Sequence, residues 1–127
     1  MKKKSLPLII IGIVFIVSLS GCDSNTRIEY PTIPVSENTE LGCIELIVDG
    51  ITFRPYGTIG HNKLRGEQIG IREDADNGII CEVKGYETTD WLIDYLDVFM
   101  GGGDTLYKAV GVTEIPADLE QYQMYDF

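Results

Sequence analysis

The dipeptide Asp49-Gly50 is the feature that most restricts how this chain of 127 residues can fold. It separates two runs rich in β-branched and aromatic residues, 43–48 and 51–56. A two-residue type I′ turn needs positive φ at both central positions, and Asp-Gly is among the pairs that adopt it most readily. The pattern therefore predicts an antiparallel β-hairpin.

The register of this hairpin can be derived from the turn. A two-residue loop places Leu46 opposite Phe53 on the apolar face and Glu45 opposite Arg54 on the other face, where opposite charges attract. Pro55 cannot donate a ladder hydrogen bond, so the second strand is expected to end, or to lie at a sheet edge, at that residue.

A second hairpin is expected from the runs 68–72 and 79–84, joined by the acidic loop 73–78. A tight Asn77-Gly78 turn would set charged residues opposite the apolar face, so the longer loop is preferred. The apolar face then consists of Ile69, Ile71, Ile79, Cys81 and Val83.

The segment 90–100 fits two periodicities. As a helix it would align Asp90, Asp94 and Asp97 on one face, and as a strand it would align Trp91, Ile93, Tyr95 and Phe99. The strand-rich surroundings favour a strand. A last strand is expected over 106–112, and Pro116 suits the first turn of a short helix over 117–122. Together the elements predict an all-β domain with one short helix, either a small antiparallel sandwich or a partly closed barrel.

The first 22 residues have the layout of an export signal. Lys2, Lys3 and Lys4 precede an apolar run of about 14 residues, 6–19, which is shorter than the roughly 20 needed for a spanning helix. The run ends in Leu19-Ser20-Gly21-Cys22, which resembles a lipobox. We therefore expect a signal peptide at 1–21 and a lipid on Cys22 that anchors the mature protein to the outer side of the cell membrane.

The mature chain is expected to comprise a tether and one domain. Residues 22–40 are polar, with prolines at 31 and 34, and are interpreted as the lipidated cysteine and a tether, whereas 41–127 form the domain. Seven basic residues against twenty acidic ones give the mature chain a net charge of −13. This charge argues against nucleic acid as a partner and indicates that the lipid, rather than the protein surface, contacts the membrane.

Several blocks of the domain resemble small exported lipoproteins of low-GC Gram-positive bacteria. The blocks are VDGITFRPYG (48–57), Gln68-Ile69-Gly70, EVKGYETTDWLI (82–93), LYK (106–108) and VTEIP (112–116). That family has no assigned activity. The resemblance implies the anchor and a compact β-rich domain, favours a strand at 90–100, and transfers no catalytic residue.

No catalytic residue, metal site or cofactor is predicted. His61 is the only histidine, and the mature serines, Ser24 and Ser36, lie in the tether, so no Ser-His-Asp triad is expected. Cys43 and Cys81 lack the paired spacing of a zinc site. Cys81 is expected to point inward and Cys43 outward, which favours two separate thiols over a disulfide.

Two loops contain candidate binding residues. Asp74, Asp76 and Asn77 offer oxygen ligands of the kind calcium prefers, but alignment on Gly78 leaves only weak ligands, so an Asx-rich turn is favoured. The loop 57–66 contains His61, Lys63 and Arg65 and is a candidate site for an anionic or cell-wall ligand, although a solvated loop is the more frequent role of such residues.

These observations favour a non-enzymatic, membrane-anchored lipoprotein that binds a protein or cell-wall ligand at the envelope. The alternative is a small envelope enzyme or enzyme inhibitor with a site that no motif identifies.

Overall fold

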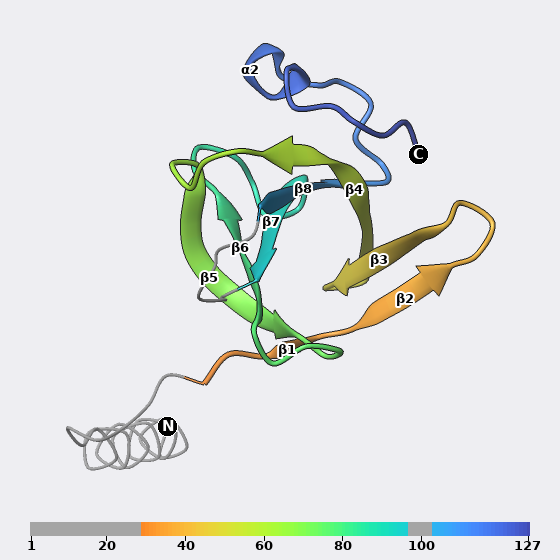
Figure 1. Ribbon diagram of the computed structural model, residues 1–127, viewed down its shortest axis with the longest axis vertical. Helices are drawn as coiled ribbons and strands as arrows, with labels where there is room; N and C mark the ends of the chain where they lie inside the picture. Colours follow the sequence, from red (N-terminus) through yellow and green to blue (C-terminus); the bar gives the residue numbers. More distant parts are fainter. Residues whose placement is uncertain (1–28, 97–102) are drawn as a thin grey trace, which may run out of the picture.

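One strongly curved β-sheet organises the protein (Figure 1). The computed structural model describes residues 29–96 and 103–127, and within them the sheet has eight strands. The strands are β1 (Thr32–Ile33), β2 (Val35–Asn38), β3 (Cys43–Val48), β4 (Ile51–Ile59), β5 (Arg65–Arg72), β6 (Gly78–Val83), β7 (Trp91–Leu96) and β8 (Asp104–Ala109). Their spatial order is β1-β5-β6-β7-β8-β4-β3-β2.

The sheet is nearly closed into a barrel. Its two outermost strands, β1 and β2, follow each other in the chain, so the sheet must curl until its edges approach. Neighbouring strands are antiparallel except β1, which runs parallel to β5. The all-β prediction is confirmed, and of its two architectures the partly closed barrel is the one observed.

The first hairpin has the predicted turn and register. Asp49 and Gly50 have φ of 52° and 80°, as a type I′ turn requires. Leu46 pairs with Phe53, and both side chains are fully buried. On the opposite face the Nε of Arg54 lies 2.8 Å from a carboxylate oxygen of Glu45.

Strand β4 does not end at Pro55, which corrects the prediction. It continues to Ile59 because a bulge between Pro55 and Gly57 shifts its register against β8. A bulge interrupts the regular ladder and so accommodates a residue without an N–H group. The residues after Pro55 therefore remain in the sheet instead of forming a loop.

The second hairpin is confirmed, and Cys81 and Val83 of its predicted apolar face are buried in one cluster, but Ile69 packs against the other cluster. Ile80, which the pattern placed on the opposite face, is fully buried, as is Cys81 beside it. Register shifts between Arg65 and Gly70 break the simple alternation of β5 against β6. Side chains from both faces of β6 join hydrophobic clusters, so this strand does not have one apolar and one polar face.

The strand interpretation of the segment after Asp90 is confirmed by β7, whereas residues 97–100 lie outside the described part of the chain. Successive side chains of a strand point to opposite faces. Trp91 and Ile93 accordingly join one hydrophobic cluster, and Leu92 joins the other. A hydrophobic cluster therefore packs on each face of the sheet at β7.

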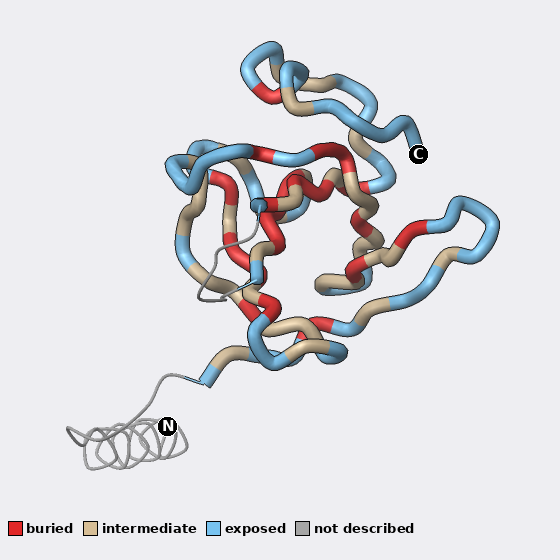
Figure 2. Tube along the Cα trace, in the orientation of Figure 1, coloured by how far each residue is buried: buried red, intermediate tan, exposed pale blue. Residues whose placement is uncertain are grey.

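The two clusters have different compositions. The first contains Tyr56, Ile59, Cys81, Val83, Trp91, Ile93, Leu106 and Leu119. The second contains Ile33, Leu46, Phe53, Ile80, Leu92, Tyr107 and Ala109. Figure 2 shows that buried residues are concentrated in the barrel strands, whereas the turn between β2 and β3 and the C-terminal segment are mostly exposed.

The folded unit begins before the expected boundary at residue 41, since β1 and β2 lie within 22–40. Strand β1 fits closely on β5, because a Cβ on Gly70 would come within 2.5 Å of the Ile33 side chain. The prolines that suggested a tether flank this short strand and leave its two residues free to pair.

The predicted short helix is observed as α2 (Ala117–Glu120), directly after Pro116. Leu119 on this helix is fully buried in the first cluster. The helix and the residues that follow it lie together on one side of the barrel, next to β4 (Figure 1). No helix among the described residues is long and apolar enough to cross a membrane.

Candidate functional site

Two of the three predicted anion-binding residues, Arg65 and His61, contact other side chains of the protein. Arg65 forms two hydrogen bonds to the carboxylate of Asp104, at 2.7 and 2.6 Å, and its guanidinium carbon lies 3.6 Å from the ring centre of Tyr95. His61 lies 3.1 Å from the Tyr122 hydroxyl and accepts a hydrogen bond from the backbone N–H of Lys63. Arg65 is therefore already neutralised, and Lys63 remains an exposed lysine.

The acidic loop is organised by an arginine. Both carboxylate oxygens of Asp74 accept hydrogen bonds from Arg72, at 2.9 and 2.8 Å, while Asp76 and Asn77 are exposed. Within residues 29–96 and 103–127, no group of three or more His, Cys, Asp or Glu side chains is placed to hold a metal ion. Asp74 acts here as a partner of Arg72.

Arg72 also holds a second, buried carboxylate. Its Nη1 lies 2.6 Å from an oxygen of Asp94, a side chain that is only 6% exposed. The other oxygen of Asp94 has no hydrogen-bond partner among the described residues. Burial raises the pKa of Asp94, and the charge and hydrogen bond of Arg72 act in the opposite direction.

Cys43 and Cys81 are free thiols, as predicted. Cys43, which was expected on the outward face, belongs to neither hydrophobic cluster but is buried, at 8% exposed. Burial raises the pKa of both thiols, that of Cys81 to about 11. Since the thiolate is the reactive form, both are poor nucleophiles near neutral pH.

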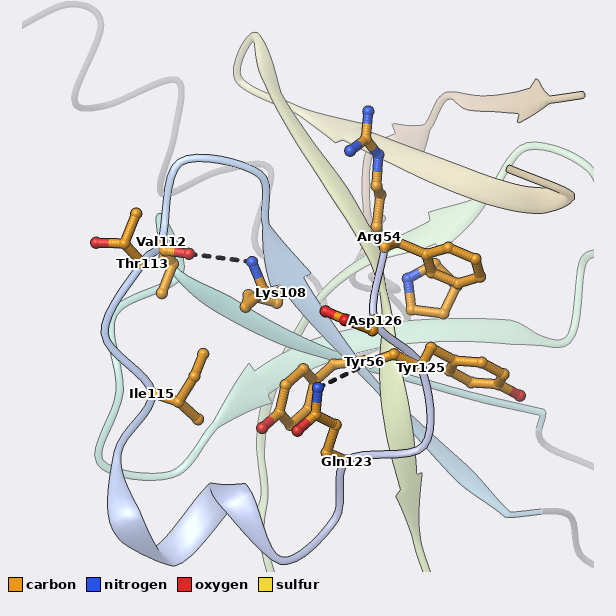
Figure 3. Close-up of a pocket in the computed structure, with 11 residues that line it drawn as sticks. Arg54, Tyr56, Lys108, Val112, Thr113, Ile115, Gln123, Tyr125 and Asp126 are labelled. Atoms are coloured by element: carbon orange, nitrogen blue, oxygen red, sulfur yellow. Dashed lines mark hydrogen bonds between the residues drawn. The ribbon is translucent and has the colours of Figure 1, made fainter. Parts of the chain in front are cut away.

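A pocket of about 210 Å³ lies between β4, β8 and the C-terminal segment, and several polar side chains line it (Figure 3). The backbone carbonyl of Tyr56 accepts hydrogen bonds from the N–H groups of Met124 and Tyr125, at 2.9 and 3.1 Å. Gly57 forms a β-bridge with Gln123. These contacts dock the C-terminal segment on β4 as one wall of the pocket.

Two cations from neighbouring strands line this pocket. Arg54 and Lys108 are direct cross-strand partners of β4 and β8. The Lys108 ammonium donates to the backbone carbonyl oxygens of Val112 and Ala109, at 3.0 and 3.4 Å. The Nε of the Arg54 guanidinium donates a hydrogen bond to the carboxylate of Glu45.

Tyr56, a tyrosine whose hydroxyl is buried, also lines this pocket. It is 3% exposed and packs edge-to-face on Trp91 with ring centres 5.2 Å apart. Its hydroxyl has no hydrogen-bond partner in the described part of the chain. Burial raises the pKa of this hydroxyl, and the charge of Glu120 adds to the effect, so the group remains protonated and can donate a hydrogen bond.

The pocket was not identified from the sequence. Arg54 and Lys108 are far apart in the chain, in the blocks 48–57 and 106–108, and they become neighbours only because β4 pairs with β8. The sequence instead suggested the basic loop 57–66 as the anion site, but the arginine of that loop, Arg65, forms an ion pair with Asp104.

No protein-family model matches this chain, and neither the curated proteins nor the solved structures contain a significant match. The resemblance to exported lipoproteins therefore stays a prediction.

Proposed function

We propose that this chain is a non-enzymatic lipoprotein, anchored through Cys22 at the outer side of the cell membrane, whose barrel binds a ligand or partner in the pocket between β4, β8 and the C-terminal segment. The anchor is supported by the lipobox-like Leu19-Ser20-Gly21-Cys22 and the lysines before the apolar run. The binding role is supported by one observation above all: a pocket lined by Lys108, whose ammonium has only neutral carbonyl partners among the described residues.

The shape of the pocket agrees with a binding role. Ligand sites are concave, mostly preformed, and combine apolar walls with a few polar groups that fix orientation. Here Val112 and Ile115 supply apolar surface, and Lys108 and Thr113 supply polar groups. Since its floor is built on paired strands, the pocket is held by the barrel rather than by a free loop.

The anchor is tested by changing the proposed lipid attachment site. The Cys22→Ala protein is expected to lose labelling by a clickable fatty acid in cells and to stay unprocessed, because the acceptor thiol is absent. Cys43→Ala is the matched control and should label like the unchanged chain, since its thiol is buried in the barrel. Equal labelling of both variants would contradict the anchor.

The binding role is tested by photo-crosslinking from the pocket in intact cells. A photoreactive amino acid at Thr113, an exposed residue of the pocket wall, is expected to give a discrete crosslinked product, because a bound partner lies within reach there. The matched control is Thr89, which is exposed and outside the pocket. A product of the same size and yield from both positions, or from neither, would refute the pocket as the binding site.

A further inference from the structure

We infer that this pocket recognises an oxyanion, a carboxylate or phosphate group of its ligand, with Lys108 as the main contact and Arg54 at the rim; this assignment rests on the proposed binding function. The ligand class follows from how the chain distributes its charges.

Of the cross-strand pair Arg54 and Lys108, only Lys108 has no carboxylate within 4.0 Å among the described residues, because Arg54 is paired with Glu45. Like charges placed directly opposite on neighbouring strands repel and destabilise a sheet. The chain has twenty acidic and ten basic residues, so a generally basic surface does not explain why two cations lie side by side. A negatively charged ligand group beside Lys108 supplies the counter-charge that this lysine lacks among the described residues.

The ammonium of Lys108 differs from the other half-buried cations of the described chain. Each described arginine lies within 4.0 Å of a carboxylate, as seen for Arg54, Arg65 and Arg72. The hydrogen bonds of Lys108 go to two neutral carbonyl oxygens. Carbonyls orient the ammonium without neutralising it, so its charge remains available to an anion.

Asp126 indicates that a carboxylate fits in this place. It belongs to the docked C-terminal segment and lines the pocket, and Figure 3 shows its carboxylate on the side of Lys108. Asp126 forms no ion pair within 4.0 Å among the described residues. An incoming oxyanion can therefore take the position next to Lys108, and Asp126 opposes it as a like charge.

The remainder of the ligand has surfaces to contact. The rings of Tyr125 and Phe127 stack with centres 5.4 Å apart and line the pocket. A ring-shaped or polyhydroxylated body that carries the oxyanion matches this arrangement.

The test is a titration of the full chain in detergent micelles, followed by ¹⁵N–¹H NMR. The probes are inorganic phosphate, glucuronate and glucose, which separate a phosphate source from a carboxylate source and from an uncharged ring. Phosphate or glucuronate is expected to shift the amides of Arg54, Lys108 and Thr113 saturably, and glucose is not. Glucose binding as tightly as glucuronate, or no saturable shift with either anion, would overturn the inference.

Two variants with opposite expected signs sharpen the test. Lys108→Gln should weaken anion binding about 10- to 100-fold, the range of a charge-assisted hydrogen bond. Asp126→Asn should strengthen it roughly 2- to 5-fold, because an exposed like charge is removed. Lys84→Gln, an exposed lysine outside the pocket, is the control and should change little. Weaker binding by Asp126→Asn, or unchanged binding by Lys108→Gln in a protein with an intact spectrum, would refute the assignment.

The outcomes also separate this inference from the proposed function. A crosslink from Thr113 without anion binding would leave the binding function standing and remove the oxyanion assignment. Anion binding without any crosslink in cells would leave an anion site and remove the proposed partner.

Discussion

Replacement of Arg72 by leucine is expected to lower the free energy of unfolding by about 3–5 kcal/mol at pH 7, the usual cost of removing one partner of a buried ion pair. The loss arises at Asp94, whose side chain is 6% exposed and whose second oxygen already lacks a partner among the described residues. Asp74, 41% exposed, contributes little to the loss because water replaces its arginine. Urea unfolding followed by the fluorescence of Trp91 measures the effect.

The cost should depend on pH, with a sign that the pKa of Asp94 determines. Burial raises this pKa above its ordinary value of 3.8, and Arg72 opposes the rise, so removal of Arg72 raises the pKa further. A native group with a raised pKa contributes stability that is fully present below the unfolded pKa and is lost as pH rises through the folded pKa. The difference between the unchanged chain and Arg72→Leu should therefore shrink as pH falls from 7 toward 4.

Two companion variants identify the cause. Combining Arg72→Leu with Asp94→Leu should recover most of the loss at pH 7, because an apolar pair of similar volume often replaces a buried ion pair without cost. Lys84→Leu removes an exposed cation and should stay within about 0.5 kcal/mol of the unchanged chain. If the loss is the same at pH 4 and pH 7 and persists in the double variant, packing rather than charge explains it.

The contrast between Asp49-Gly50 and Arg72 shows which parts of the fold were predictable. The Asp-Gly turn sets its own φ values, and the pairs beside it, including Glu45 with Arg54, follow by counting outward. The buried partner of Arg72, Asp94, is by contrast 22 residues away and comes close only after β6 and β7 have paired. Local conformational preference predicts contacts beside a turn, but it does not predict contacts between strands that are far apart in the sequence.

The ends of the sheet were missed for the same reason. Strand β1 consists of Thr32 and Ile33 between two prolines, and no local pattern marks it as a strand. It is stabilised by parallel pairing with Ile71 and by the close approach to Gly70, both far along the chain. A tertiary partner thus overrides a weak local preference.

The site required the same long-range information. His61, Lys63 and Arg65 are neighbours in sequence, which made their loop look like an anion site, yet Asp104 neutralises its arginine. Arg54 and Lys108 have no sequence proximity, and strand pairing brings them together. Proximity in sequence is therefore a poor guide to a binding site in a barrel whose strands pair out of order.

Replacement of Gly57 by alanine is expected to detach the C-terminal segment from the barrel. A Cβ at this position would lie 1.6 Å from the backbone oxygen of Tyr122, a distance that no side-chain adjustment relieves. The segment must move, and with it goes the packing of Leu119, which is fully buried. We expect a loss of about 2–5 kcal/mol, comparable to truncating a buried leucine.

The detachment has a spectroscopic, a proteolytic and a functional consequence. Trp91, 2% exposed and packed on Tyr56, should gain solvent contact and shift its emission to longer wavelength, and limited proteolysis should cleave after α2. Gly60→Ala is the matched control, because nothing lies within 4 Å of its added Cβ. The docked segment forms one wall of the pocket, so Gly57→Ala should also abolish binding of the oxyanion probes, whereas Gly60→Ala should retain it. A Gly57→Ala protein with a protected C-terminal segment and unchanged Trp91 emission would show that the segment is not held by this contact, and the pocket would then need another wall.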